Sequence, residues 1–565
     1  MARTKLCICC SLLLVIAIIA VIIFITISSL KCPNGTFRNA AVAADAIKCS
    51  EIGRDILQRG GSAVDGAIAA LLCTGIMNPQ SAGIGGGSIF TVMDSSGNVK
   101  IINSRETAPS NMNPDRLKSC PRSSKMLADG NGIWIGVPGE IRGYEMAHKL
   151  YGKLPWADLF QPTIKLAREG FPIPPVQGGA ISNIDRTKMP SLWKAFSDKN
   201  GNLLKSGDII KFEKLADTLE MIANNGSDAF YTGKIAEDLV RDVKEAGGVL
   251  TLLDLASYKA TVTDAWVVPM GEYQMYIPPP PSGGALLSLI LNIMKGYQMK
   301  SSPQSTDQKV QFYHRYVEAF KFANGLKKHI RDFKFANGLK KHIRDPNFKS
   351  EKIANQIKEG SFANYIRSLI SSNRTHDPEF YNLTSYLDSM GTTHLSVLAE
   401  DGSAVAVTST INYIFGSRVY SPSTGIILNN ELTDFCGRAD NISPGEQPPS
   451  SMAPAVLKSG SEILVTGASG GSMITTGLAS ALINHLWFGK SLKEAIATPV
   501  VFVDSENSVK FEPNFDKDVI KALEALGHNQ KQATRFYNVV NAVEKKGGCV
   551  CAVSDYRKRG EAAGY

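Results

Sequence analysis

The chain has 565 residues, 44% of them hydrophobic and 20% charged, which is typical of globular proteins and excludes disorder, collagen and a simple coiled coil. At roughly 100–200 residues per domain, the length allows two to four ordinary domains or one large core. The formal charge of +9 comes from 61 Lys and Arg against 52 Asp and Glu, spread along the chain without a long basic run. We therefore do not expect a nucleic-acid-binding protein.

The N-terminus is the first strong pattern. Leu6 to Leu30 spans 25 positions without a charged residue, more than the roughly 20 that a helix needs to cross a bilayer. Arg3 and Lys5 precede it, which keeps residues 1–5 in the cytoplasm and sends the chain from 31 onward outside. A cleaved signal peptide is the alternative, but its apolar core is only about 7–15 residues long. We predict a signal anchor at 6–30 and a single-pass type II protein of the plasma membrane.

Sequons and cysteines agree with an extracellular main part. Asn-x-Ser/Thr glycosylation sequons occur at Asn34, Asn225, Asn373, Asn382 and Asn441. Seven of the ten cysteines follow the apolar segment, where disulfides persist, and their odd number leaves at least one unpaired or bonded to another chain.

The following elements are expected in chain order. Ala40 to Asn78 shows helical apolar spacing interrupted by Gly60-Gly61, which predicts two packed helices. Residues 89–92 and 99–103 predict strands, and 139–370 a helix-rich region with a surface crossing at Pro278–Pro281. From His394 onward, apolar strand patterns prevail (394–401, 403–412, 418–422, 425–430, 463–468, 500–504 and 509–513), with helices at 474–488 and 516–526. Helices followed by strands that have their own helices indicate a layered α/β fold.

A 12-residue segment occurs twice, at 321–332 and at 334–345, with a period of 13. In a continuous helix, 13 extra residues rotate everything downstream by 1300°, or about 220° after whole turns. The apolar face would then point the wrong way. Either one copy is looped out, or Gly325 and Gly338 allow a bend, or the duplication is a defect.

Three Gly-rich sites could carry chemistry. Gly83-Ile84-Gly85-Gly86-Gly87 lies between a helix and a strand, the reverse of a dinucleotide loop, and favours a tight backbone crossing. Gly467-Ala468-Ser469-Gly470-Gly471 fits G-x-S-x-G between a strand and a helix. It could be a nucleophile elbow or a pair of amides for an oxyanion. For the elbow, His485 or His528 with Asp504 would be the partners of Ser469.

The third site is Gly391-Thr392-Thr393-His394. A threonine is a weak nucleophile unless a base lies beside it. Cutting the chain at Gly391–Thr392 would free an α-amine, whose pKa of about 7.7–8.0 suits proton transfer at neutral pH.

Eight segments in order carry a resemblance to a known family: GIGGG, INSRETAP, GVPGE, DSMGTTHLSVLAEDGSAVAVTSTIN, GIILNNELTDF, PPSSMAP, GASGG and the terminal GEAAGY. From about Ala40 to Tyr565 the chain resembles gamma-glutamyltransferase (gamma-glutamyl transpeptidase), of the N-terminal-nucleophile hydrolase superfamily. The Pro278–Pro281 run, Cys436 and the tail GGCVCAVSD resemble more closely the leukotriene C4-hydrolysing branch (gamma-glutamyl-leukotrienase). The resemblance implies a four-layer αββα sandwich, here preceded by one transmembrane helix.

The resemblance also implies self-cleavage at Gly391–Thr392 into a large chain (31–391) and a small catalytic chain (392–565). Thr392 would be the nucleophile, Thr410 would orient it, and Gly470 and Gly471 would bind the oxyanion. The donor's α-carboxylate and ammonium would be bound by Arg105, Ser450 and Ser451 on one side and by Asn412, Glu431 and Asp434 on the other. A Cys49–Cys73 disulfide is implied, and no cofactor or metal.

The implied substrates are glutathione, its S-conjugates and leukotriene C4, with water, amino acids or dipeptides as acceptors. Thr393 stands where the better-known branch has Ala, and Ala453 follows PSSM, so acceptor preference could differ. Two other hypotheses stay open. One is an uncut, inactive membrane glycoprotein caused by the duplication, and the other is a serine hydrolase that uses Ser469.

Overall fold

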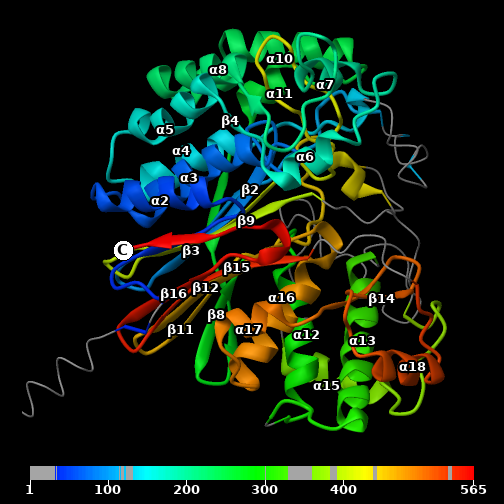
Figure 1. Cartoon of the computed structure of the whole chain (residues 1–565). Coiled ribbons are helices and arrows are strands. Elements are labelled where there is room, and N and C mark those ends of the chain that lie inside the picture. The colour runs from blue at the N-terminus through cyan, green and yellow to red at the C-terminus, as the bar shows by residue number, and fades with distance from the viewer. Residues whose placement is uncertain are drawn as a thin grey trace, which may run out of the picture.

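The computed structural model describes residues 32–33, 35–113, 115, 120–121, 131–299, 301–328, 359–381, 391–436, 442–531 and 538–565 (Figure 1). The predicted anchor at 6–30, the second copy of the duplication, and Asn34, Asn382 and Asn441 lie outside these residues. Within them, no helix is both long and apolar enough to cross a membrane.

Two antiparallel sheets form the centre of the molecule. The first has the strand order β17-β1-β9-β10-β2-β3-β6, and the second has the order β16-β15-β12-β11-β8-β7. The first consists of β1 (Ala41–Ala43), β2 (Gly87–Met93), β3 (Val99–Ser104), β6 (Thr261–Asp264), β9 (Thr393–Leu398), β10 (Ala404–Thr410) and β17 (Ala562–Gly564). The second consists of β7 (Trp266–Met270), β8 (Tyr273–Ile277), β11 (Ala455–Ser459), β12 (Glu462–Ser469), β15 (Val539–Lys546) and β16 (Cys549–Val553). Two short pairs, β4 (Phe171–Pro172) with β5 (Ile209–Ile210) and β13 (Val501–Val503) with β14 (Val509–Phe511), stand apart.

Helices cover the outer face of each sheet (Figure 1). Over the first lie α2 (Ile47–Gln58), α3 (Ala63–Met77), α4 (Glu140–Tyr151), α5 (Trp156–Glu169), α6 (Pro175–Ile181), α7 (Pro190–Ala195), α8 (Glu213–Asn225), α9 (Asp228–Tyr231), α10 (Lys234–Glu245) and α11 (Leu252–Ser257). Over the second lie α12 (Gly284–Lys295), α13 (Thr306–Lys328), α15 (Gly360–Leu369), α16 (Ile474–Leu482), α17 (Leu492–Ala497) and α18 (Lys517–Ala525). The predicted four-layer αββα sandwich is therefore the observed architecture.

Strand periodicity separates the layers. In β10, Val405 and Val407 belong to the core between the first sheet and the helices that cover it. Ala404 and Ala406 belong to the core between the two sheets. Alternate residues of a strand point to opposite faces. Small alanines between the sheets let the two sheets approach, and the larger valines fill the space under the helices.

Several sequence predictions need correction. Ala41–Ala43, predicted as helix, is strand β1, because it pairs with both β9 and β17. Five described strands, β4 to β8, interrupt the region 139–370 that was predicted to be helix-rich. Residues 418–422 and 425–430 form no strand, only an isolated bridge between Tyr420 and Ile427.

The Pro278–Pro281 run was expected at the surface, but Pro278, Pro280 and Pro281 are buried. The run packs beneath the 450–452 segment, where the Pro281 carbonyl accepts a hydrogen bond from the Ser450 amide at 2.7 Å. The prediction failed because a proline lacks only the N–H donor, and its carbonyl can still hold a buried partner.

Residues 321–328, the described part of the first copy of the duplication, belong to the fold. They form the end of helix α13, and Lys321, Phe322 and Ala323 are buried. The Asn324 side chain donates a hydrogen bond to the Val503 carbonyl at 3.0 Å. The first copy therefore packs against residues that belong to the C-terminal third of the chain.

Three disulfides join cysteines in the described part of the chain. Cys49–Cys73 is the bridge that the resemblance implied, and it joins α2 to α3. Cys32–Cys549 and Cys120–Cys436 each connect the region before Gly391 with the region after it. Cys551 is the free cysteine among the described residues, in agreement with the odd count.

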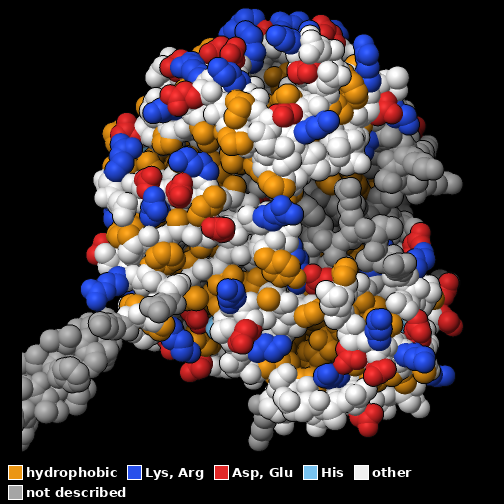
Figure 2. Space-filling view, in the orientation of Figure 1, with side chains coloured by type: hydrophobic (Ala, Val, Ile, Leu, Met, Phe, Trp, Pro, Cys, Tyr) orange, Lys and Arg blue, Asp and Glu red, His pale blue; other side chains and the backbone are white. Residues whose placement is uncertain are grey.

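The surface is mixed in charge. On the face in Figure 2, Lys and Arg side chains are interspersed with Asp and Glu side chains over both halves of the molecule. Asn225 and Asn373, the two sequon asparagines in the described part of the chain, are exposed as glycan acceptors must be.

Candidate active site

Thr392 lies immediately before the central strand β9, in a strained backbone conformation. Its φ is +92°, in a region that β-branched residues rarely occupy. Gly391 precedes it, and a Cβ built on Gly391 would lie 2.0 Å from the Asn412 carbonyl oxygen. Backbone strain of this kind concentrates at functional sites and persists only where the surroundings enforce it.

The surroundings do enforce it. The Thr392 amide donates to the Ser81 carbonyl at 3.2 Å, and the side chain is buried, with the residue 3% exposed. The Thr392 hydroxyl lies 3.0 Å from the Thr410 hydroxyl at the end of β10. The Thr410 oxygen also accepts the Asn412 amide at 2.8 Å. Thr410 thus links the candidate nucleophile to the next polar group, Asn412.

A buried cation with two carboxylates lies beyond Asn412. The Arg105 guanidinium pairs with Glu431 at 2.6 Å and with Asp434 at 2.7 Å. The Asn412 side-chain amide donates to the other Asp434 oxygen at 3.0 Å. Arg105 and Glu431 have 1% exposed side chains, whereas Asp434 is 24% exposed, so a ligand can reach the group from the Asp434 side.

Ser450 and Ser451 belong to the same site. Arg105 donates to the carbonyls of Pro448 and Pro449 at 2.8 and 2.9 Å, so the guanidinium lies against the segment that continues into the two serines. The Ser450 hydroxyl accepts the Met452 amide at 3.1 Å. The structure therefore brings together the predicted carboxylate-binding and ammonium-binding residues, and Arg105 of the first group pairs with Glu431 and Asp434 of the second.

Burial shapes the protonation of this site. Burial raises the pKa of Glu431 above its ordinary value, although Arg105 opposes the shift. The neighbouring Glu106 is also fully buried, and burial together with the charge of Glu431 raises its pKa well above the usual range. One proton shared between these two carboxyls would relieve their repulsion.

Gly470 and Gly471 follow strand β12, with φ of +121° and +58°. This turn starts the helical segment that continues into α16, and the first amides of a helix have no partner within the helix. The adjacent Ser469 hydroxyl accepts a hydrogen bond from the Lys558 ammonium at 3.0 Å, and Lys558 also donates to the Thr392 carbonyl at 2.6 Å. The two glycines are thereby connected to the candidate nucleophile.

Sequence reasoning missed three residues of this site: Lys558, Asp45 and Ser81. Asp45 accepts hydrogen bonds from Lys558 at 2.7 Å and from the Thr393 hydroxyl at 2.6 Å. No spacing pattern connects positions 45, 81 and 558. The lysine stands just before the GEAAGY segment and has no feature of its own that marks it.

The GIGGG segment is a tight backbone crossing, as expected. A Cβ on Gly85, Gly86 or Gly87 would lie 2.2, 2.0 or 2.4 Å from the backbone oxygen of Ile427, Thr410 or Ser104, respectively. These glycines let three backbone segments of the site meet, which any side chain would prevent.

The serine-hydrolase hypothesis lacks its triad. His485 contacts the Lys490 carbonyl and Glu544, each at 2.8 Å, and His528 contacts His314 at 2.8 Å. Asp504 pairs with Lys510 at 3.0 Å. Among the described contacts, neither histidine reaches Ser469, whose hydroxyl is held by Lys558.

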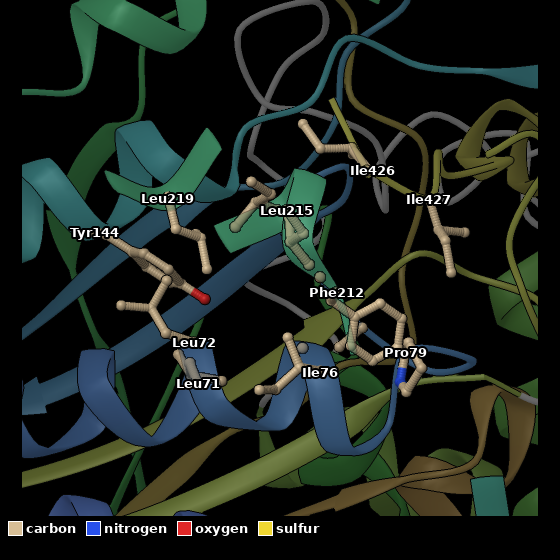
Figure 3. A pocket seen from close by; sticks show the side chains of 15 residues that line it. Leu71, Leu72, Ile76, Pro79, Tyr144, Phe212, Leu215, Leu219, Ile426 and Ile427 are labelled. Atoms are coloured by element: carbon tan, nitrogen blue, oxygen red, sulfur yellow. The ribbon is translucent and has the colours of Figure 1, made fainter. Parts of the chain in front are cut away.

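Two of the cavities formed by described residues lie near the site. The first, about 30 Å³ in volume, is lined mainly by apolar side chains from α3, α8 and the loop that ends at Ile427 (Figure 3). This is room for about one or two water molecules, so it is a packing gap and no substrate pocket. The second, of about 430 Å³, includes Tyr258 and Gln447, which both donate to the Arg105 carbonyl.

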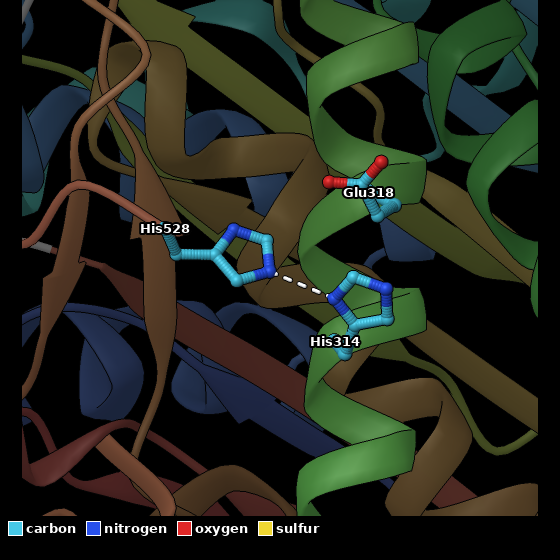
Figure 4. A group of neighbouring side chains, drawn as sticks. All are labelled: His314, Glu318 and His528. Atoms are coloured by element: carbon cyan, nitrogen blue, oxygen red, sulfur yellow. Dashed lines mark hydrogen bonds between the residues drawn. The ribbon is translucent and has the colours of Figure 1, made fainter. Parts of the chain in front are cut away.

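One histidine–carboxylate cluster in the described part of the chain has metal-ligand types: His314, Glu318 and His528 (Figure 4). His314 donates to the Ser371 carbonyl at 2.7 Å, which leaves its other nitrogen to accept from His528 at 2.8 Å. The other nitrogen of His528 then accepts from Lys321 at 3.1 Å. The lysine ammonium is the cation of this cluster, so the donors do not fit a metal.

Both the sequence and the fold of this chain are similar to those of known proteins. The family model described as Gamma-glutamyltranspeptidase matches residues 49–565. The chain is 43% identical to "Glutathione hydrolase 5 proenzyme" of Rattus norvegicus over 97% of both chains. It is 42% identical to the Homo sapiens protein of the same name over 96% of both. The structure of a cephalosporin acylase from Bacillus halodurans superposes with a TM-score of 0.82, at 23% identity, over 95% of this chain and 97% of that one.

Two sheets between two helical layers, with a threonine at the start of a central strand, define an N-terminal-nucleophile hydrolase fold. The family model matches most of the chain, so the comparison shows the family as well as the fold. The chain belongs to the gamma-glutamyltranspeptidase family.

Proposed function

We propose that this protein is a self-cleaving enzyme that removes the γ-glutamyl group from glutathione and its S-conjugates through an ester on Thr392. One observation carries the proposal. The strained, buried Thr392 is hydrogen-bonded to Thr410 and connected through Asn412 to the Arg105–Glu431–Asp434 group.

Self-cleavage is the first step. The Thr392 hydroxyl attacks the Gly391 carbonyl carbon, the Thr392 nitrogen leaves as an amine, and water hydrolyses the resulting ester. The products are a large chain that ends at Gly391 and a small chain of 174 residues, 392–565. The positive φ of Thr392 supports this step, because cleavage releases the strain. Two relatives named proenzymes support it as well.

Donor recognition follows from the charges. A γ-glutamyl group carries a free carboxylate and a free ammonium on one carbon. Its carboxylate would replace the acids at Arg105, near Ser450 and Ser451, while its ammonium would pair with Glu431, Asp434 and the Asn412 oxygen. Exchange of one set of ion pairs for another keeps the buried charges compensated, which a ligand without both groups cannot do.

Acyl transfer then uses the groups around Thr392. Its α-amine takes the hydroxyl proton as the hydroxyl attacks the γ-carbonyl, and the amides of Gly470 and Gly471 stabilise the oxyanion. The leaving amine takes the proton. Water releases glutamate from the ester, or an amino acid or dipeptide accepts the acyl group.

The finer assignments belong to the same proposal. The similarity to proteins named glutathione hydrolase 5 and the sequence features of the leukotrienase branch favour leukotriene C4 as a further donor, yielding leukotriene D4. The apolar segment 6–30 supports a type II anchor in the plasma membrane with the catalytic part outside. Three disulfides and the exposed Asn225 and Asn373 support an oxidising, glycosylating compartment.

The test is N-terminal sequencing of the full chain, expressed in a secretory host and separated on a reducing denaturing gel. Reduction is required because two disulfides join the two parts. The small chain has a mass of about 19 kDa, in proportion to 61.0 kDa for 565 residues. A fragment that begins Thr-Thr-His-Leu, with glutamate release from glutathione, supports the proposal. An intact chain without this activity refutes it and favours the inactive glycoprotein.

A further inference from the structure

Lys558 is a buried lysine whose ammonium contacts the backbone of the candidate nucleophile. Its side chain is 1% exposed. Its nitrogen lies 2.6 Å from the Thr392 carbonyl, 2.7 Å from an Asp45 oxygen and 3.0 Å from the Ser469 hydroxyl. Lysine is almost never fully buried unless paired, so its position here carries a high desolvation cost that these acceptors offset.

The turn that carries Lys558 is itself anchored. It is a 3₁₀ turn, Tyr556–Lys558, capped by Asp555, which accepts the Arg557 amide at 2.9 Å. Asp555 in turn donates its amide to Asn541 at 3.0 Å, and Arg557 forms a bidentate pair with Glu512 at 2.7 Å. The ammonium is therefore held by a rigid frame, and the two chains that cleavage would produce meet at it through Asp45 and Thr392.

We propose that Lys558 is a positioning residue for the nucleophile: its ammonium holds the Thr392 carbonyl and thereby orients the hydroxyl and, after cleavage, the α-amine. This inference rests on the proposed function. It goes beyond that function because Thr410 contacts the hydroxyl of Thr392 and Lys558 contacts its carbonyl, and neither contact alone determines the direction of both the hydroxyl and the α-amine on one Cα.

The charge of Lys558 has a second effect. Only the Cα and the carbonyl carbon separate the α-amine from the oxygen that the ammonium contacts. A nearby positive charge disfavours the protonated amine, so Lys558 keeps more of the amine in the neutral form that accepts a proton. In the described part of the chain, other charged or titratable groups around this region include Asp45, Asp555 with Arg557, His394, and Asp434 with Arg105, Glu431 and Glu106. Of these, burial lowers the pKa of His394 to about 3, so it remains neutral.

Lys321 provides a matched control. Among the described residues it is the other lysine whose side chain is 1% exposed and charge-paired, with its nitrogen 2.6 Å from Thr375 and 3.7 Å from Glu318. It contacts His528 and Glu318 of the histidine–carboxylate cluster and has no described contact with Thr392. Lys321→Met therefore removes a buried ammonium without touching the nucleophile.

The experiment compares Lys558→Met, Lys558→Arg and Lys321→Met with the wild-type full chain. γ-Glutamyl-p-nitroanilide hydrolysis is measured from about pH 6 to about pH 9, around the pKa of an α-amine. Rates are expressed per mole of small chain with Thr392 at its N-terminus. Lys558→Met is expected to lower kcat by about tenfold or more with KM within about twofold, and to shift the acid limb of kcat to higher pH. Lys558→Arg keeps the acid limb near that of the wild type, and Lys321→Met keeps both kcat and the limb.

The variants distinguish outcomes that overturn the inference from outcomes that support it. A Lys558→Met enzyme with kcat within about twofold of the wild type, or with an unshifted acid limb, shows that the lysine is only a counter-ion for Asp45. If Lys558→Met is folded but uncut while Lys321→Met is cut, the inference is supported, because self-cleavage uses the same hydroxyl. If both are uncut, loss of any buried ammonium suffices and the inference falls. A wild-type chain that is uncut and inactive refutes the proposed function instead.

Discussion

Thr410→Val tests the contact between the two threonines. Valine has nearly the shape of threonine, so the change removes the hydroxyl and leaves the volume of the side chain. Two hydrogen bonds are lost: the one to the Thr392 hydroxyl at 3.0 Å and the one from the Asn412 amide at 2.8 Å. Both lie in a buried site, where water cannot replace the lost partner.

The two losses have different expected effects. A net hydrogen bond contributes about 0.5–1.5 kcal/mol, so loss of the bond that orients Thr392 should slow its attack about two- to twelvefold. The Asn412 amide is left buried without its acceptor, which costs about 1–3 kcal/mol of the free energy of unfolding. Thr410→Ser keeps the hydroxyl and should retain both the rate and most of the stability.

The assay follows two reactions that use the same hydroxyl. Self-cleavage is measured as the appearance of the small chain on a reducing gel, and donor hydrolysis as p-nitroaniline release per mole of small chain. Thr410→Val should slow both, and Thr410→Ser neither. If Thr410→Val matches Thr410→Ser in both rates, the Thr392–Thr410 contact has no role in orienting the nucleophile, and that part of the reasoning is refuted.

Three further predictions follow. Gly391→Ala should prevent or greatly slow self-cleavage, because its Cβ would lie 2.0 Å from the Asn412 carbonyl oxygen; a small chain formed at the wild-type rate on a reducing gel would contradict this. His485→Asn should lower the free energy of unfolding more at about pH 5.5 than at about pH 9. Burial lowers the pKa of His485, but the hydrogen bond with Glu544, the charge of that carboxylate and the hydrogen bond with the Lys490 carbonyl together outweigh burial and raise the pKa above the ordinary value. The stabilisation is therefore complete below about pH 6.5 and is lost as the pH rises through the raised folded-state pKa; equal losses in denaturant titrations at the two pH values would refute this. Deletion of residues 333–345 removes one repeat and leaves the sequence of α13 unchanged, so kcat and the extent of self-cleavage should stay at wild-type levels or rise; loss of both would show that the second copy is needed.

Much of the fold could be predicted because the strands have strong periodicity. The alternation in 403–412 and the turn around Gly60-Gly61 correspond to β10 and to the break between α2 and α3. The strand Ala41–Ala43 was missed because alanine favours helices, and only pairing with β9 and β17 makes this segment extended. The strands β7 and β8 were missed because they are short and lie among helices.

The residues of the candidate site were likewise predictable only in part. Thr392, Thr410 and the Arg105 group lie in segments with a recognisable family resemblance, and the structure brings them within hydrogen-bonding distance of one another or of a shared neighbour. Lys558 and Asp45 are 513 positions apart in sequence and meet only through the fold. Single-sequence patterns carry no information about such a long-range pair. The ion pairs between the predicted carboxylate-binding and ammonium-binding residues also came from the structure alone.

The strand order of the first sheet has a consequence for the lifetime of the protein after the proposed cleavage. Strand β1 lies before the proposed cleavage site at Gly391–Thr392, yet it is held between β17 and β9, which both lie after it. The second sheet likewise continues from β11 into β8 across the same division. Neither product of cleavage contains a complete sheet, so an unfolded enzyme would have to recover its structure by intermolecular assembly of two interlocked polypeptides. The chain would fold before it is cleaved. After cleavage, the lifetime of the folded protein would depend on the height of the unfolding barrier rather than on a folding equilibrium. For the mature molecule, heat inactivation should therefore be a matter of rate, with little recovery on cooling.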